Sequence, residues 1–120
     1  MASFEQHCND CERLLGLCYE EVNHWMDEYF RTHGPYHRQF RHHWDGVKQV
    51  HKLYGRDWAK AVIIHIVRDC GGVPNKSDYR SAVMVFIRPP EELMYDGTEK
   101  AAVKFQAVVE EEWQKLMKEF

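Results

Sequence analysis

The sequence lacks several features that would assign it to a class of protein at once. No apolar run approaches the roughly 20 residues that span a bilayer; the longest are 61–64 and 82–87. The first residues do not join a positive segment to an apolar one, so we expect no secretory signal, no membrane association and a cytoplasmic location. Proline and glycine are scarce, at 4 and 7 of 120 residues, which excludes a fibrous or low-complexity chain.

Signatures of three common chemistries are also absent. Gly71-Gly72 is not followed by the Lys-Ser/Thr of a phosphate-binding loop. The stretch 42–45 comes near the signature of metal-dependent phosphohydrolases but lacks their adjacent His-Asp pair. Cys70 stands next to Asp69, whose negative charge raises the pKa of a thiol and so disfavours a cysteine nucleophile. The sequence therefore names no reaction, and it leaves open whether the protein is an enzyme.

The composition is that of an ordinary globular protein, with 44% hydrophobic and 13% aromatic residues. A length of 120 residues suits one hydrophobic core, so we expect residues 1–120 to form a single domain. Residues 1–30 carry seven acidic side chains and one arginine, whereas 31–56 carry six Lys or Arg and five His. Because these two segments can neutralise each other and the net charge is −3, we do not expect nucleic-acid binding.

The spacing of apolar residues predicts an all-α fold, a small bundle of four to five helices. Steps of three and four run unbroken through the first segment, at Phe4, Cys8, Cys11, Leu15, Cys18, Val22, Trp25 and Tyr29. A second helix is predicted over 35–54, and a third over 57–69, which is apolar nearly all round and belongs inside the bundle. Residues 82–87 suit a short helix or one strand-like segment, although a lone strand would leave its backbone unpaired.

The last helix is predicted to begin at an N-cap, Thr98, and to continue through Phe120. Its apolar residues are expected to face broadly inward. They are Val103, Val109, Trp113, Leu116 and Phe120.

The unbroken seam over 4–29 also predicts partners. We expect its helix to pair antiparallel with the helix over 35–54 and to leave a surface that closes a homodimer. Its cysteines then act as small buried hydrophobes, and in a reducing compartment all four cysteines are expected to be free thiols. The group His7-Cys8-x-x-Cys11 lacks a second ligand pair at finger-like spacing, so we do not place zinc there.

Histidines and aspartates are concentrated in the middle of the chain, over 36–46 and 65–79. His65 and Asp69 are four residues apart on a helix without a polar face, so they share one side of it and must find polar partners inside. His43 falls on the apolar stripe of its own helix, and we expect it to converge with them, with His37 and Arg41 nearer the mouth of the site. Imidazoles with a carboxylate suit a divalent metal such as zinc, iron or manganese. The predicted metal ligands are His37, His43, His65 and Asp69.

Two other interpretations stay open for the same residues. Arg38, Arg41 and His42 are suited to a small phosphorylated ligand, because guanidinium groups bind phosphate oxygens in pairs. Alternatively, the His/Asp cluster is purely structural, since buried histidines are usually neutral and hydrogen-bonded. The protein would then be a non-catalytic bacterial or phage interaction protein that acts by binding a partner protein.

The same stretches resemble a family of small bacterial and phage helical domains of unknown function. In that family Trp-x-Asp precedes His-Arg-x-x-Arg-His-His-x-x-Gly, and His-x-x-x-Asp-x-Gly-x-Ile/Val-Pro-x-x-x-Asp-Trp/Tyr follows. The matching positions here are Trp25, Asp27, His37, Arg38, Arg41, His42, His43, Gly46, His65, Asp69, Gly71, Pro74, Asp78 and Tyr79. The family pattern has a histidine where this chain has Asn23. The resemblance implies a shared site and no particular chemistry.

Overall fold

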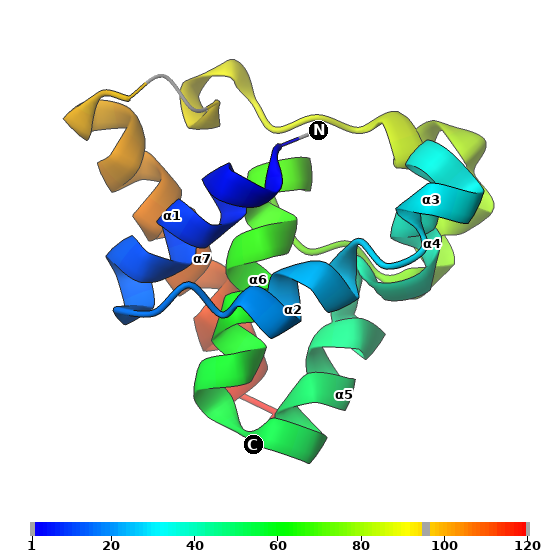
Figure 1. Cartoon of the computed structure of the whole chain (residues 1–120), viewed down its shortest axis with the longest axis horizontal. Coiled ribbons are helices and arrows are strands. Elements are labelled where there is room, and N and C mark those ends of the chain that lie inside the picture. The colour runs from blue at the N-terminus through cyan, green and yellow to red at the C-terminus, as the bar shows by residue number, and fades with distance from the viewer. Residues whose placement is uncertain (1, 95–96, 120) are drawn as a thin grey trace.

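Helix α6 (Arg56–Cys70) is the centre of the fold, as its apolar surface predicted. All ten residues from 61 to 70 are buried, because α1 (Phe4–Leu15), α2 (Glu20–Met26), α5 (Trp44–Tyr54) and α7 (Glu99–Met117) pack around it (Figure 1). The computed structural model describes residues 2–94 and 97–119, and within those ranges it contains no strand. The predicted all-α fold with five main helices is therefore confirmed.

Shorter elements complete the chain. α3 (Phe30–His33), the 3₁₀ turn η1 (Gly34–His37) and α4 (Arg38–Arg41) follow one another directly. After α6 the chain forms three more 3₁₀ turns, which are η2 (Lys76–Arg80), η3 (Ala82–Phe86) and η4 (Glu91–Leu93). The segment 82–87 is thus a short helical turn and not a strand. None of the described helices is both long and apolar enough to cross a membrane.

The helix predicted over 4–29 is divided into α1 and α2, so the prediction of one continuous apolar stripe along it is wrong. Gly16 ends α1 in the left-handed conformation at φ 86°, and Tyr19 is also left-handed at φ 52° before α2 begins. This turn brings Cys18 beside Cys8, and the two form a disulfide. The expectation of four free thiols is therefore wrong for this pair, whereas Cys11 and Cys70 are free and buried as predicted.

The second predicted helix is broken as well, between α4 and α5. His43 has extended backbone and caps α5, since its Nδ1 accepts the Gly46 N–H at 3.1 Å. Gly46 is required at this place, because a Cβ there would collide with the carbonyl oxygen of Arg41. Because the helix is broken here, the side chains of His42 and His43 point in different directions although the two residues are adjacent.

The segment after α6 holds this turn in place. Tyr79 donates a hydrogen bond from its hydroxyl to the His42 carbonyl at 2.7 Å, and the Trp44 N–H donates to the Pro74 carbonyl at 3.0 Å. Gly71 ends α6 at φ 84°, and Pro89 and Pro90 pack directly on it. The two motif stretches of the sequence are therefore joined by hydrogen bonds.

The last helix begins at the Thr98 cap, as predicted. Val109 and Leu116 face the core, and Trp113 is half-buried. Val103 is exposed, contrary to the prediction, because Ala102 and Phe105 occupy the inner face of α7 instead. Phe120 lies outside the described residues.

Candidate metal centre

Four acidic and imidazole side chains from separate parts of the chain meet beside α6. Asp27 directly follows α2, His42 lies at the break between α4 and α5, and α6 supplies His65 and Asp69. One ligand atom from each of them lies within 4.8 Å of the other three. The side chains of His42, His65 and Asp69 are fully buried, and that of Asp27 is 23% exposed, which leaves one edge of the cluster open to solvent.

The separations within the cluster are those of a ligand set. Asp69 Oδ2 lies 3.2 Å from His42 Nε2 and 3.4 Å from His65 Nε2. Asp27 Oδ1 lies 3.3 Å from His65 Nε2 and 3.6 Å from His42 Nε2. Charge-assisted hydrogen bonds are shorter, at about 2.7–2.9 Å. Two ligand atoms on a tetrahedral ion with bonds of about 2.1 Å lie roughly 3.4 Å apart. All four separations are close to that spacing.

The hydrogen bonds around His65 determine which of its nitrogens faces the cluster. Asn23 Nδ2 donates to the Cys18 carbonyl at 2.9 Å, so Asn23 Oδ1 is the atom that faces His65. His65 Nδ1 lies 2.9 Å from that oxygen and must donate to it. In the neutral ring, Nε2 is therefore a lone pair directed at Asp27 and Asp69. Two carboxylates and a lone pair repel each other unless a proton or a metal ion lies between them.

Two more histidines surround the four. His37 Nδ1 donates to the Gly34 carbonyl at 2.7 Å, which directs its Nε2 at Asp27 Oδ1, 3.0 Å away. The His7 ring stacks on the His65 ring at a centroid distance of 3.5 Å. His7 Nε2 lies 3.3 Å from Asp69 Oδ1 but is poorly aligned for a hydrogen bond. Both rings have a nitrogen within reach of a cluster carboxylate.

The electrostatics of the cluster favour charge on its carboxylates. Burial raises the pKa of Asp69, but the hydrogen bonds of His42 and His65 outweigh it and hold that pKa well below its usual range. Burial lowers the pKa of His65, but hydrogen bonds to Asp27 and Asp69 outweigh it and raise the pKa to about 9. Burial dominates at His42 and lowers its pKa to about 4. At neutral pH the metal-free cluster therefore holds two carboxylates and a protonated His65, whose proton a bound metal ion would have to displace.

The predicted ligands are only partly brought together. His65 and Asp69 lie in the cluster as expected, and His37 contacts it through Asp27. His43 does not converge with them: it caps α5, and its ring contacts Tyr79. The separation follows from the break at 42–43, which turned neighbouring side chains apart.

The residues predicted for a phosphorylated ligand do not share one site. His42 belongs to the cluster. Arg41 stacks its guanidinium over the Trp25 and Tyr29 rings, at 4.2 and 4.6 Å from their centroids, and donates to Glu28 at 2.8 Å. Arg38 lines a neighbouring cavity that shares only Asp69 with the cluster.

Sequence reasoning missed Asp27 as a member of the cluster and His7 and Asn23 as its neighbours. Asp27 was marked only by the Trp25-x-Asp27 part of the family resemblance. His7 had a weaker signal, since it directly precedes the first cysteine of the α1 stripe. Comparison of the chain with models of protein families, with curated proteins and with solved structures gave no match.

Proposed function

We propose that this protein binds a divalent transition metal through Asp27, His42, His65 and Asp69. The observation that carries the proposal is the set of four N–O separations of 3.2 to 3.6 Å. Two of them, from His42 to Asp69 and from His65 to Asp27, have hydrogen-bond geometry, but all four are longer than charge-assisted hydrogen bonds usually are. All four are close to the spacing of ligands on a tetrahedral ion. Two imidazoles and two carboxylates suit zinc best in this geometry, and iron(II) and manganese(II) less well.

The surroundings of the ligands support the same function. A metal-bound histidine usually donates its other ring N–H to a fixed acceptor, which sets the tautomer and the ring orientation. His65 has such an acceptor in Asn23 Oδ1, and the Asn23 amide is itself fixed by the Cys18 carbonyl. His42 Nδ1 is buried without a hydrogen-bond partner among the described residues, so His42 is the less strongly oriented ligand.

Elemental analysis and metal competition test the proposal. Protein purified without an affinity tag is dialysed against a chelator, reloaded with zinc, and titrated against a chromophoric chelator to give the stoichiometry and the Kd. We expect one ion per chain. A ligand at 100 times its Kd should also stabilise the fold by about 2.7 kcal/mol, read as a higher Tm.

Matched variants separate the site from surface histidines. Asp69→Asn and His65→Gln should weaken zinc binding at least 100-fold and keep their helical circular dichroism. His24→Gln is the control, because that side chain is exposed and its contacts, an ion pair with Glu20 and stacking on Phe4, lie outside the cluster. No stoichiometric zinc in the reloaded protein, or equal zinc affinity in all three variants, would refute the proposal.

A further inference from the structure

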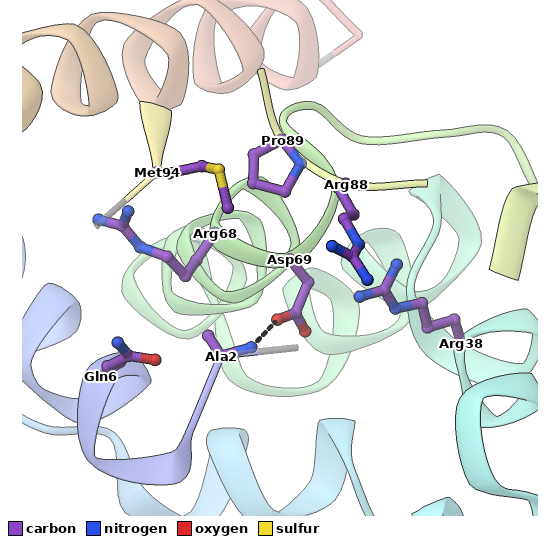
Figure 2. A pocket seen from close by; sticks show the side chains of 8 residues that line it. All are labelled: Ala2, Gln6, Arg38, Arg68, Asp69, Arg88, Pro89 and Met94. Atoms are coloured by element: carbon purple, nitrogen blue, oxygen red, sulfur yellow. Dashed lines mark hydrogen bonds between the residues drawn. The ribbon is translucent and has the colours of Figure 1, made fainter. Parts of the chain in front are cut away.

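A cavity of about 290 Å³ lies beside the metal centre, and Asp69 belongs to both. Three arginines, Arg38, Arg68 and Arg88, also line it (Figure 2). A cavity with three cations and one carboxylate attracts anions.

Of the three arginines, only Arg68 has a carboxylate partner among the residues that the structure describes. Arg68 makes a two-bond ion pair with Asp10, at 2.7 and 2.9 Å, and donates to the Leu93 carbonyl at 2.8 Å. Within 2–94 and 97–119, no carboxylate lies at ion-pair distance from Arg38 or Arg88. The two remaining guanidinium groups therefore supply unbalanced positive charge to the cavity.

Arg38 is unusual because it is both buried and without an anionic partner. Arg38 is only 5% exposed. Its guanidinium makes one hydrogen bond to a described residue, from Nη1 to the Ile87 carbonyl at 2.6 Å. A guanidinium has five N–H donors, and a buried charge without a partner is costly. Figure 2 shows its guanidinium and that of Arg88 pointing toward each other beside Asp69. An oxyanion bound between the two guanidinium groups would neutralise both charges through paired hydrogen bonds.

We propose that this cavity binds the phosphate or carboxylate group of a small organic anion, held between Arg38 and Arg88. Both groups offer oxygens that accept paired hydrogen bonds from guanidinium groups. Pro89 and Met94 line the same cavity and give the organic part an apolar contact. If the metal proposed above binds, the anion would lie next to the metal centre, on the other side of Asp69. Only this placement beside a metal rests on the proposed function.

Titration of inorganic phosphate into chelator-treated protein tests the proposal, followed by calorimetry and by the ³¹P resonance. We expect one saturable site. Arg88→Gln should weaken it at least tenfold without loss of folding, because Arg88 is exposed. Arg56→Gln is the matched control, since it removes the same charge from the opposite end of α6.

Three results bear on the outcome. Saturable binding that Arg88→Gln weakens and Arg56→Gln leaves within twofold supports the site. Absence of saturable binding, or equal loss in both variants, overturns it, the second because it indicates attraction by net charge alone. Metal content is measured separately in the reloaded protein, so failure of the zinc proposal is seen independently of the phosphate result.

Discussion

Two buried polar clusters lie next to each other at the end of α6, and they differ in how complete they are. Arg68 and Asp10 bind each other through two hydrogen bonds of 2.7 and 2.9 Å, and the Leu93 carbonyl accepts a third. Asp69, the next residue, has imidazole nitrogens at 3.2 to 3.4 Å. The first distances are those of a charge-assisted ion pair. The second are longer, and those to His42 and His65 match the spacing of the metal ligands that we propose.

The Arg68–Asp10 pair and the cluster that we propose to bind a metal differ in two features. Burial and opposite charge are common to both clusters, so neither property identifies function. The distinguishing features are the separations and the direction of the lone pairs. Arg68 donates to both carboxylate oxygens of Asp10 and to the Leu93 carbonyl, whereas His65 Nε2 in the neutral ring faces two carboxylates with a lone pair.

The largest effect on stability is expected from removal of the Arg68–Asp10 ion pair. Asp10→Ala leaves Arg68 buried without its carboxylate, and we expect it to lower the free energy of unfolding by about 3–5 kcal/mol. Urea unfolding measures the loss. Zinc affinity of the folded fraction should stay within a few-fold, since Asp10 is not among the four ligands. A loss below about 1 kcal/mol would show that the pair is not the rigid element that its geometry indicates.

A pH series distinguishes the metal-free from the metal-loaded cluster. The folded pKa of His65, at about 9, exceeds the ordinary value of 6.5, so its contribution is complete below pH 6.5 and is lost as the pH rises through 9. The lowered pKa values of Asp27 and Asp69 give the opposite loss, as the pH falls below their ordinary range. Chelator-treated protein should therefore lose stability between pH 6.5 and 9, by up to about 3 kcal/mol.

Zinc replaces the His65 proton, so the stabilisation that zinc provides should grow over the same interval. Unfolding curves at pH 6.5, 7.5 and 9, each with zinc and with a chelator, give both slopes. If stability depends on pH with the same slope in zinc and in chelator, zinc binds elsewhere. His65→Gln should flatten both.

Removal of the Cys8–Cys18 disulfide tests how far the Arg68–Asp10 pair and the His/Asp cluster depend on α1. This helix supplies Asp10 but none of the four proposed ligands. Cys8 and Cys18 are ten residues apart, and opening a loop of that length costs about 2–3 kcal/mol in the chain-entropy account. The double variant Cys8→Ala with Cys18→Ala should lose this much and change zinc affinity less than threefold. Cys11→Ala is the control for lost packing, because Cys11 is buried and forms no disulfide. A larger loss from Cys11→Ala than from the double variant would contradict the pairing.

Periodicity predicted the helical fold and the central place of α6, because a helix without a polar face must be surrounded. It could not predict the breaks at Gly16 and at 42–43. The apolar rhythm continues across both of them, and only contacts distant in sequence, such as that of Tyr79 with the His42 carbonyl, favour the break. The candidate site was predicted only where two ligands share one helix, as His65 and Asp69 do. Asp27 and His42 join them through tertiary packing, which spacing does not encode.

The smallest effect expected is the difference between two glycine-to-alanine changes at helix ends. Gly71 and Gly16 both end helices in the left-handed conformation, at φ 84° and 86°, so alanine costs each about 1–2 kcal/mol through the backbone alone. They differ in their neighbours. A Cβ at Gly71 would lie 2.7 Å from Pro90 Cδ and 3.1 Å from Pro89 Cα, whereas nothing lies within 4 Å of one at Gly16.

Gly71→Ala should therefore cost about 1 kcal/mol more than Gly16→Ala in urea unfolding, since overpacking adds to the backbone term. The displaced segment carries Arg88 and the Leu93 carbonyl that Arg68 binds. Phosphate binding should weaken in Gly71→Ala and stay unchanged in Gly16→Ala, while zinc affinity stays the same in both. Equal stability of the two variants would show that the Pro89-Pro90 segment moves away without cost. It would also show that the Arg68–Asp10 pair does not depend on the position of that segment.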